Sequence, residues 1–440
     1  MSAFLVEGGV PLHGSVRIGG AKNASFKLMI AALLGSTESR LLNFSHISDV
    51  QTVKEIIREL GGEVLEAGER ALFIRPQKMR SYTIDNSVGA QGRFSTMFIG
   101  PLVARFGQAL VPAPGGDKIG KRPLERHFEG LQKLGITVTQ QSNMILCQAK
   151  KLKGCTYRFE KNTHTGTETL LMAAVMAKGK TVLENAAEEP EIDDLIAFLN
   201  SMGAHIRRRA GRVIEIEGVK RLQGAIHKIM PDRNEAVSYA CGAIATKGDV
   251  IIENARANDM KAFLDKLEEI NAGYEVGQYG IRFFYKQKLR ATDIVTEIEP
   301  GFMTDWQPLW ATLATQCTGK SIIHETIMQS RFQYVDALTQ MGADIRLFNP
   351  EVKHPEKVYN FNLSDDSPDF FHAIEISGPT QLKAGHFSVV DLRHGATLIL
   401  AALTAKGVSR IDHVELVDRG YEQLESRLRS MGAKIQRTSD

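Results

Sequence analysis

The sequence of 440 residues has little of what marks several large classes of protein. It has only four cysteines, Cys147, Cys155, Cys241 and Cys317, and no two of them form a CxxC pair. Scattered cysteines are typical of buried free thiols in a reducing compartment, not of a disulfide framework. No run of about 18 apolar residues exists, which argues against a membrane-spanning helix. The N-terminus lacks a basic stretch followed by an apolar core, so we expect a cytoplasmic protein and no membrane partner.

The charge balance and the missing motifs argue against further classes of function. Lys and Arg number 54 and Asp and Glu number 51, so the formal net charge is +3, too small to suggest nucleic-acid binding. The 12 histidines are dispersed, so we expect no metal, and we expect no cofactor. The sequence contains no GxSxG, no HExxH, no GxxxxGK[ST] and no GxGxxG after a strand.

What the sequence does contain is a short phrase that recurs six times. Glu59-Leu-Gly-Gly-Glu-Val64 returns, for example, as Ser430-Met-Gly-Ala-Lys-Ile435, and Ile270-Asn-Ala-Gly-Tyr-Glu-Val276 is the loosest copy. Each copy follows a helical pattern, so its glycine is predicted to end a helix and the residues after it to form a strand. The steps between the glycines are 74, 68, 70, 69 and 90 residues, and the glycines are Gly61, Gly135, Gly203, Gly273, Gly342 and Gly432.

A second phrase precedes each of these copies, and in it an apolar helix ends in glycine before a β-branched strand. Met176-Ala-Lys-Gly-Lys-Thr-Val-Leu-Glu-Asn185 is one example. Each glycine of the second phrase lies 23 to 28 residues before its partner, and these glycines are Gly35, Gly107, Gly179, Gly248, Gly319 and Gly407. Six matched pairs predict an α/β architecture built from six repeats of about 70 residues.

One segment breaks this rhythm between the fifth and sixth repeats. Residues 349–371 contain Pro350, Pro355 and Pro368 and the polar run Ser364-Asp-Asp-Ser367. They account for the longest step, of 90 residues. An inserted surface loop or hairpin is the prediction for this segment.

Short polar clusters interrupt the apolar pattern and are the candidates for chemistry. Ile18-Gly-Gly-Ala-Lys-Asn-Ala-Ser-Phe26 opens an apolar helix near Lys22, which suits an anion because backbone N–H groups and the helix dipole face outward. A turn with a solvated lysine would look the same. Residues 112–123 form a glycine-rich loop carrying Asp117 and Arg122, either a mobile element that closes over ligands or a plain surface loop.

Two further clusters carry acids. Asp305 ends the phrase Gly301-Phe-Met-Thr-Asp305 in an apolar-flanked turn. Val417-Asp-Arg-Gly-Tyr421 is preceded by Asp391-Leu-Arg393, and the neighbouring acids and arginines of these phrases could be structural ion pairs. Together the clusters supply cations and carboxylates that suit a small polyanionic substrate and proton transfer near neutral pH. A closed-off site between two three-repeat domains is the natural place for such a substrate.

At these residues the chain resembles the enolpyruvyl transferases over essentially its whole length. The phrase Gly20-Ala-Lys-Asn-Ala24 favours the branch that acts on UDP-N-acetylglucosamine, because the sister enzyme of the shikimate pathway normally carries Gly-Ser-Lys-Ser there. The other matching phrases are Gly100-Pro-Leu-Val-Ala-Arg-Phe-Gly107, Gly115-Gly-Asp-x-Ile-Gly-x-Arg-Pro123, Glu184-Asn-Ala-Ala-x-Glu-Pro-Glu-Ile192, Pro231-Asp-Arg233 and Asp418-Arg-Gly-Tyr-Glu422.

The resemblance implies a fold of two inside-out α/β barrel domains, each made of three repeats, with the active site in the cleft. The first domain would span residues 22–230 and carry a flexible catalytic loop at 112–123. The second would comprise residues 1–21 and 231–440, because the N-terminal strand of the family joins the C-terminal domain. The insertion near 349–371 belongs to the second domain.

The resemblance also implies roles for single residues. Lys22, Arg122 and Arg419 would hold the phosphate and carboxylate of phosphoenolpyruvate, and Arg393 would lie nearby. Lys22, Arg419, Asp305 and Asp117 would form the catalytic set. In it Asp117 stands where the family usually has a cysteine that donates a proton.

The remaining implied roles concern the sugar nucleotide. Asn23 and Asp305 would contact the sugar, and Asp305 would accept the proton of its 3-hydroxyl. The positions that match nucleotide-sugar contacts are Arg93, Arg122, Pro123, Lys161, Thr163, His164 and Ile327. Residues 161–166 depart from the family pattern, which more often has small residues here. The resemblance implies that His164 and Thr165 sit near the diphosphate.

The chemistry implied by the resemblance is addition and elimination. C3 of phosphoenolpyruvate is protonated, the acceptor hydroxyl attacks C2, and phosphate leaves from a tetrahedral intermediate. With UDP-N-acetylglucosamine as acceptor, this is the first committed step of peptidoglycan precursor synthesis. Two alternatives remain open: a paralogue that uses another nucleotide or sugar phosphate, and a binding homologue without turnover. We expect a monomer that is insensitive to fosfomycin.

Overall fold

The structure is a computed structural model that describes residues 2–116 and 119–439 of the chain. The chain divides into two compact units. Unit 1 comprises Met1–Ile18, Asp117–Lys121 and Pro231–Asp440, and unit 2 comprises Gly19–Gly116 and Arg122–Met230. The predicted residue Asp117 lies outside the described residues.

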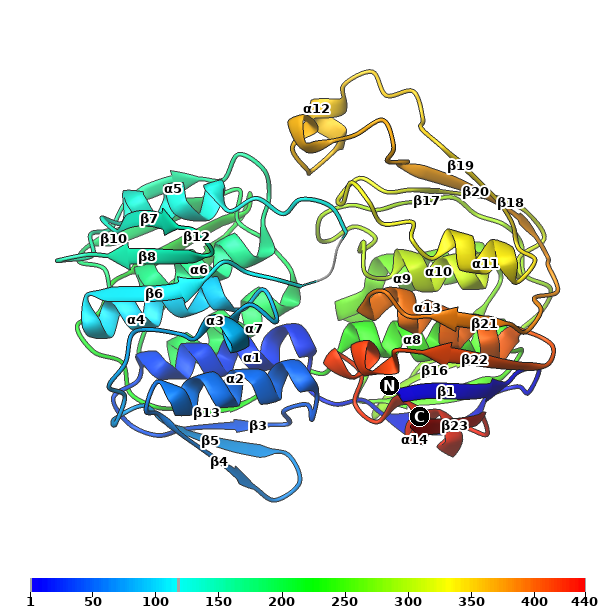
Figure 1. Cartoon of the computed structure of the whole chain (residues 1–440), viewed down its shortest axis with the longest axis horizontal. Coiled ribbons are helices and arrows are strands. Elements are labelled where there is room, and N and C mark those ends of the chain that lie inside the picture. The colour runs from blue at the N-terminus through cyan, green and yellow to red at the C-terminus, as the bar shows by residue number, and fades with distance from the viewer. Residues whose placement is uncertain (1, 117–118, 440) are drawn as a thin grey trace. The chain divides into compact units, whose positions relative to one another are not determined.

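Each unit repeats one order of elements three times: a buried helix, a strand, a second helix and a hairpin (Figure 1). The helices of unit 2 are α1 Lys22–Ala31, α2 Ser48–Glu59, α3 Asn86–Gly89, α4 Ile99–Phe106, α5 Glu125–Lys133, α6 His164–Ala174 and α7 Pro190–Ser201, with 3-10 turns at Ala32–Leu34 and Ser95–Phe98. Its strands are β3 Ser39–Leu42, β4 Glu63–Ala67, β5 Ala71–Arg75, β6 Gln108–Pro112, β7 Thr137–Gln141, β8 Met144–Gln148, β9 Thr156–Arg158, β10 Lys180–Glu184, β11 His205–Arg209, β12 Val213–Glu217 and β13 Ile226–Lys228.

Unit 1 is built in the same way. Its helices are α8 Arg233–Ala245, α9 Lys261–Glu269, α10 Gln307–Ala314, α11 Val335–Gln340, α12 Pro355–Val358, α13 Leu392–Thr404 and α14 Leu424–Ser430, with 3-10 turns at Ala257–Met260, Leu363–Asp365 and Val414–Arg419. Its strands are β1 Ser2–Glu7, β2 His13–Arg17, β14 Asp249–Glu253, β15 Gly273–Val276, β16 Gly280–Phe284, β17 Ile294–Val295, β18 Gly319–His324, β19 Asp344–Phe348, β20 Ala373–Gly378, β21 His386–Ser388, β22 Val408–Asp412 and β23 Lys434–Ser439.

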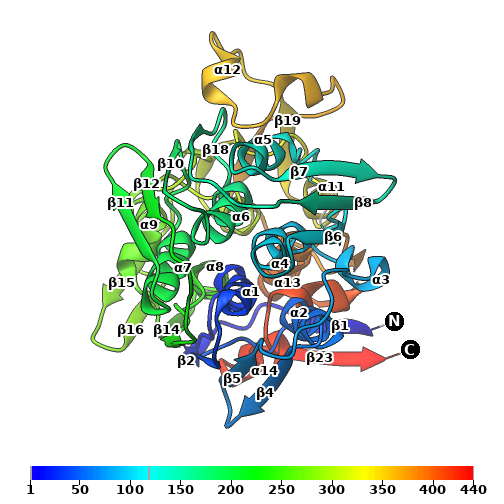
Figure 2. The ribbon, with the colours of Figure 1, turned by 90° about the vertical axis from the view of Figure 1, so that its left-hand side faces the viewer.

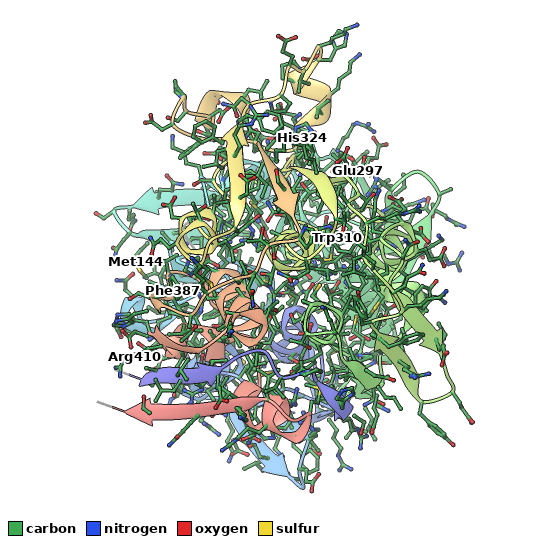
Figure 3. The ribbon with its side chains drawn as sticks, turned by 90° about the vertical axis from the view of Figure 1, so that its right-hand side faces the viewer. Met144, Glu297, Trp310, His324, Phe387 and Arg410 are labelled. Carbon is green, nitrogen blue, oxygen red and sulfur yellow. The ribbon has the colours of Figure 1, made fainter. Side chains whose placement is uncertain are left out.

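The buried helices are apolar on nearly all sides, which explains why they form the interior of each unit. Every residue of α8 is buried, and so is every residue of α10. In unit 1, α8, α10 and α13 pack against one another, and Figure 3 shows Trp310 of α10 in the middle of the unit. In unit 2, α4 packs on α6, and Figure 2 shows these helices and α1 inside, with the strands around them.

The sheets of each unit stay separate and do not join into a continuous barrel within the described residues. Unit 2 has the sheets β13-β3-β5-β4, β6-β8-β7 and β11-β12-β10-β9, and unit 1 has β15-β16-β14-β2, β17-β18-β20-β19 and β21-β22-β1-β23. The α/β repeat with helices inside and sheets outside is therefore present, as separate sheets around the helices.

The N-terminal strand completes the last sheet of unit 1. β1 lies between β22 and β23 and is antiparallel to both, with Phe4 opposite Ile411 on one side and Arg437 on the other (Figure 1). It takes the place that the last strand of the hairpin takes in the other repeats. The next strand, β2, is the parallel edge strand beside β14.

The predicted helix-ending glycines adopt the backbone conformation that favours glycine at five of six positions. Gly61, for example, has φ +90°, and an L side chain is disfavoured there. The prediction is wrong for the loose copy, where Asn271 has φ +65° and Gly273 is the first residue of β15. Asparagine tolerates the left-handed region, so Asn271 takes the place of the helix-ending glycine in this copy. The second phrase differs at Gly35, which has φ −69°, and at Gly248, where the positive φ belongs to Lys247.

Residues 349–372 connect β19 to β20 in the fifth repeat and contain α12 and the 3-10 turn Leu363–Asp365. Tyr359 and Phe361 are buried and their rings stack, with centroids 4.9 Å apart. His324 of β18 contacts Tyr359, with His324 Nε2 3.2 Å from Tyr359 Oη, and Figure 3 places His324 beside this connection.

None of the described helices is long and apolar enough to cross a membrane. Among residues 2–116 and 119–439, no group of three or more His, Cys, Asp or Glu side chains could hold a metal ion. All four cysteines are free, and three of them are buried, with Cys155 half-buried.

Candidate active site

Unit 2 gathers cationic side chains around the start of α5. Arg93 Nη2 donates to the backbone O of Arg122 at 3.1 Å. Burial and the charge of Arg122 lower the pKa of Arg93 to about 9. The positive charges of Arg93 and Arg122 repel each other, and a bound anion near them would offset this repulsion. Arg126, in the first turn of α5, is buried in the same region.

His127 ties this cationic group to the first turn of α6. Its Nε2 lies 3.0 Å from Thr165 Oγ1. Burial, Arg93 and Arg126 lower the pKa of His127 to about 3, so the ring is neutral at physiological pH. Thr163 is the N-cap of α6, and its Oγ1 accepts a hydrogen bond from Gly166 N at 3.2 Å. The first turn of α6 is therefore held on one side by a neutral imidazole surrounded by arginines.

On its other side, the first turn of α6 meets a buried ion pair. Lys27 Nζ of α1 lies 2.5 Å from Glu168 Oε1 of α6. His164 Nε2 lies 3.1 Å from Lys27 Nζ and 3.2 Å from Glu168 Oε1. Burial and Lys27 oppose the charged ring, but Glu168 and Glu189 outweigh them and raise the pKa of His164.

Lys22 is the first residue of α1, as predicted. Its Nζ pairs with Asp49 Oδ2 at 2.7 Å and lies 5.3 Å from the centre of the Phe26 ring. Phe26 also faces Lys27, whose Nζ lies 5.8 Å from the ring centre. The same aromatic ring therefore connects the predicted phosphate-binding lysine with the buried Lys27.

Other predicted contacts of unit 2 lie at the ends of the same elements. Asn23 follows Lys22 in α1, and Pro123 precedes α5. Lys161 lies just before α6, and all three side chains are half-buried. The predicted residues of unit 2 therefore lie in or just before the first turns of α1, α5 and α6.

In unit 1 the predicted acid Asp305 lies between two arginines. Arg331 Nη2 donates to Asp305 Oδ1 at 2.9 Å, and Arg393 Nη2 donates to Asp305 Oδ2 at 3.0 Å. Both arginine side chains are buried, whereas 26% of the Asp305 side chain is exposed. The carboxylate is thus oriented by two fixed donors while part of it stays open to solvent.

Arg393 is itself fixed by Tyr421. Its Nη1 donates to Tyr421 Oη at 2.8 Å, and Tyr421 Oη lies 2.6 Å from Ser238 Oγ. Although burial opposes the charged guanidinium, Tyr421 and Asp305 raise the pKa of Arg393. Arg393 stays charged at any physiological pH.

The hypothesis of local ion pairs in the two Asp/Arg phrases is wrong. Asp391 is the N-cap of α13, and its Oδ1 accepts hydrogen bonds from the backbone N of Arg393 at 2.8 Å and of His394 at 2.9 Å. Asp418 pairs with Arg437, at 2.7 Å from its Nη2. A short acid near a helix start satisfies free backbone N–H groups, and this is why Asp391 caps instead of pairing. Arg419 ends the turn Val414–Arg419 and is half-buried.

Glu325 organises the segment that carries Ile327. Its Oε1 accepts hydrogen bonds from Ile327 N at 2.8 Å and Thr296 Oγ1 at 3.0 Å, and its Oε2 accepts one from Thr304 Oγ1 at 2.9 Å. Glu325 is fully buried, and burial raises its pKa against the pull of Arg331. Because Thr304 precedes Asp305, the same carboxylate holds the Asp305 turn and the Ile327 turn together.

Sequence reasoning missed Lys27, Glu168, Glu325 and Arg331. For Lys27 a signal was present, because it interrupts the apolar run from Phe26 to Ala32, whereas Glu168 lies between Thr167 and Thr169. Charged side chains are almost never fully buried unless they are paired, so a lone Lys and a lone Glu in two buried helices predict each other. Glu325 and Arg331 lie in irregular segments and carry no comparable pattern.

The comparisons with known proteins agree with this architecture. The family model of EPSP synthase (3-phosphoshikimate 1-carboxyvinyltransferase) matches residues 6–428. The UDP-N-acetylglucosamine 1-carboxyvinyltransferase of Acidobacterium capsulatum is 38% identical over 99% of this chain and 96% of its own length. The protein of the same name from Koribacter versatilis is 39% identical over 100% of this chain and 97% of its own length.

Solved structures show the same fold at lower identity. The enolpyruvyl transferase NikO from Streptomyces tendae superposes with a TM-score of 0.86 at 20% identity, over 100% of this chain and 99% of that one. An EPSP synthase from Acinetobacter baumannii superposes with a TM-score of 0.75 at 17% identity over 100% of both chains. At these identities the likeness concerns the fold alone.

Proposed function

Because the chain belongs to the EPSP synthase family of carboxyvinyltransferases, we propose that it transfers the enolpyruvyl group of phosphoenolpyruvate to the 3-hydroxyl of UDP-N-acetylglucosamine. The observation that carries the choice of acceptor is the similarity along the whole chain, at 38–39% identity, to two proteins named for that reaction. The phrase Gly20-Ala-Lys-Asn-Ala24 supports the same branch of the family.

The proposal assigns anion binding to unit 2. Lys22 and Arg122 hold the phosphate and carboxylate of phosphoenolpyruvate, and Arg419 of unit 1 adds a third cation. Arg93, Lys161 and the first turn of α6 hold the sugar nucleotide, with Asn23, Pro123, Thr163, His164 and Ile327 as further contacts. The lowered pKa of Arg93 supports this assignment, because a guanidinium in that position gains from a bound anion.

Proton abstraction is assigned to unit 1. Asp305 accepts the proton of the 3-hydroxyl as the hydroxyl oxygen attacks C2 of phosphoenolpyruvate. Arg331 and Arg393 donate to its two oxygens and fix the direction of the carboxylate. The partial exposure of Asp305 supports the assignment, because a purely structural acid between two buried arginines has no need of an open face.

The balanced reaction has two steps. In the first, C3 of phosphoenolpyruvate gains a proton, which we assign to Asp117, and the sugar oxygen forms a bond to C2. In the second, C3 returns a proton to Asp117 as the bond from C2 to the phosphate oxygen breaks, and the hydroxyl proton held by Asp305 leaves with the phosphate, which gives the enolpyruvyl ether and inorganic phosphate. The cations stabilise charge on phosphate as it departs. The step belongs to the synthesis of peptidoglycan precursors, and we propose that it runs in the cytoplasm on a monomeric enzyme that fosfomycin does not inhibit.

The test is release of inorganic phosphate from phosphoenolpyruvate in the presence of a panel of nucleotide sugars and sugar phosphates. We expect UDP-N-acetylglucosamine to give the highest kcat/KM and a reaction without acceptor to give no phosphate. A matched variant, Asp305→Asn, reports background release. If another acceptor gives a higher kcat/KM, the assignment of the acceptor is wrong. If no acceptor gives turnover, the protein is a binding homologue.

A further inference from the structure

A buried charged cluster links α1 to α6 inside unit 2, and the proposed catalytic chemistry does not use it. Lys27 is 2% exposed and Glu168 is fully buried. The side chains lie among buried helix residues, since residues 24–31 of α1 and 166–174 of α6 are all buried, and the only other polar ones among them are Ser25, Thr167 and Thr169. The pair is thus an ionic contact between two helices of an apolar interior.

An ion pair in this position is a poor means of stabilising the fold. Desolvation of two charges offsets most of their attraction, and apolar side chains of similar volume often stabilise such an interior as well or better. Stability of the fold therefore does not explain why Lys27 and Glu168 are charged. His164, which contacts both charges, is the group they can influence.

His164 Nε2 has two partners and can use only one hydrogen bond at a time. In the neutral ring protonated at Nδ1, Nε2 accepts a hydrogen bond from Lys27 Nζ at 3.1 Å. In the charged ring, Nε2–H carries part of the positive charge 3.2 Å from Glu168 Oε1, at ion-pair distance. Protonation therefore replaces a hydrogen bond from Lys27 by an ion pair with Glu168.

The surrounding charges favour the protonated ring. The charged groups that act on His164 are Lys27 of α1, Glu168 of α6 and Glu189, the N-cap residue of α7. Glu189 Oε2 is buried and accepts no hydrogen bond from the described residues. One lysine and two carboxylates leave one negative charge unbalanced, and a proton on His164 supplies the missing positive charge. This balance explains why the pKa of His164 is raised although burial and Lys27 both oppose it.

We infer that Lys27 and Glu168 are positioning residues that control the proton on His164, and that protonated His164 strengthens binding of the diphosphate of a nucleotide sugar at the first turn of α6. The inference rests on the proposed function for the identity of the anion. His164 is the first residue of an 11-residue helix, where the dipole and the free backbone N–H groups also favour an anion. His127, on the other side of this turn, stays neutral, so of the two histidines only His164 changes its charge near neutral pH.

The first test follows the His164 ring directly by NMR titration of the intact protein, and it needs no substrate. We expect the ring to titrate above the ordinary range of histidine in the wild type. In Glu168→Gln we expect its titration midpoint to fall by at least about one pH unit, because the favourable carboxylate is lost. An unchanged midpoint in Glu168→Gln overturns the inference. Glu215→Gln, which removes a half-exposed partner of Lys180 in the same unit, is the matched control and should leave the midpoint unchanged.

The second test measures affinity for UDP-N-acetylglucosamine by calorimetry from about pH 6 to about pH 8, a range in which the charge of its diphosphate diester is constant and which lies below the lowered pKa of Arg93. In the wild type we expect affinity to weaken about tenfold as pH rises through the His164 titration, the loss expected for one charge-assisted contact. His164→Gln and Glu168→Gln should bind with little pH dependence. The same slope in all variants overturns the inference.

A paired replacement guards against loss of the fold. Lys27→Met combined with Glu168→Leu removes both charges at once, and such an exchange is often tolerated in an interior. We expect this variant to fold, to titrate His164 near the ordinary range of histidine and to lose the pH dependence of binding. If it keeps the wild-type pH dependence, Lys27 and Glu168 do not control His164. Binding with the expected pH dependence but without phosphate release would overturn only the proposed function, whereas no binding at any pH would overturn the inference.

Discussion

Arg393 Nη2 donates to Asp305 Oδ2 at 3.0 Å, although the two residues are 88 positions apart in the chain. Arg393 lies in the first turn of α13, where Asp391 caps the helix, and Asp305 lies just before α10. The two helices pack against each other, so the ion pair forms at the contact between two repeats. An acid held in this way has a fixed direction before any substrate arrives, which is the requirement for a general base.

Replacement of Asp305 tests this role. We expect Asp305→Ala to abolish turnover, a loss of at least about a hundredfold, while affinity for UDP-N-acetylglucosamine weakens only modestly because other groups position the nucleotide. The measurements are steady-state kinetics, calorimetry and thermal unfolding. Asp249→Ala is the control, because it removes a bidentate partner of Arg282 elsewhere in unit 1. It shows how much Tm falls when an Asp–Arg pair outside the proposed site is lost. A large drop in Tm with a proportionate loss of binding would mark Asp305 as a structural acid.

Lys22 is expected to act through its charge on the phosphoenolpyruvate anion. Lys22→Ala should cost about 3–4 kcal/mol of transition-state stabilisation, or roughly a hundredfold or more in rate. Lys261→Ala is the control, because Lys261 is an exposed lysine that pairs with Asp265 one helical turn away. Steady-state kinetics on both variants decide the matter. A Lys22→Ala rate within about threefold of the wild type removes the assignment.

The buried, neutral His127 should make the free energy of unfolding fall in acid. Its pKa is lowered to about 3 in the folded protein, so between the ordinary value near 6.5 and about 3 only the unfolded chain binds the proton. Stability therefore falls as pH drops below about 6.5, by about 1.4 kcal/mol per pH unit for this one group. Urea unfolding at several pH values should show a shallower acid loss for His127→Asn than for the wild type.

The control for this measurement is His354→Asn, because His354 is 66% exposed. It should leave the pH dependence unchanged. Equal slopes for His127→Asn and the wild type would show that His127 takes up its proton in the folded protein as readily as in the unfolded chain.

Because Asp117 stands in place of the family's cysteine, we expect fosfomycin not to alkylate the wild-type protein. The drug alkylates the cysteine that the family usually has at this position, and a carboxylate is a much poorer nucleophile than a thiolate. We expect the wild type to stay unmodified and active, and Asp117→Cys to stay active and gain the mass of the drug on the loop peptide. Alkylation of Asp117 in the wild type, or full activity of Asp117→Asn, would exclude Asp117 as the proton donor.

Helices α4 and α6 approach each other too closely at Gly100 to leave room for a side chain. A Cβ atom at this position would lie 2.7 Å from the backbone N of Ala173. Because backbone cannot yield as a flexible side chain does, Gly100→Ala should destabilise unit 2 by about 1–3 kcal/mol. Gly68→Ala has no atom within 4 Å of the new Cβ and lies at a positive φ, so it reports the backbone cost alone. An equal loss of stability in the two variants would rule out close packing as the reason for Gly100.

The repeat could be predicted from the sequence because its signals are local. The start of α1 at Lys22 and the turn at Gly61 follow from neighbouring residues alone: apolar spacing sets the helix, and a glycine supplies the left-handed turn that ends it. The same reasoning failed at Gly273 because Asn271 can adopt that conformation as well. The sequence alone therefore determined the class of fold, the number of repeats and the helix start that carries Lys22.

The partners of the candidate site were decided only by the tertiary structure. Nothing near Asp305 in the chain indicates Arg393, and nothing near Phe4 indicates that it lies opposite Ile411 in the last sheet. Lys27 interrupts an apolar run, but only the packing of α1 and α6 brings its Nζ to 2.5 Å from Glu168 Oε1. Local backbone preferences act over a few residues, whereas the energy of a charge depends on every group that surrounds it, and those groups come together only when the whole unit has folded.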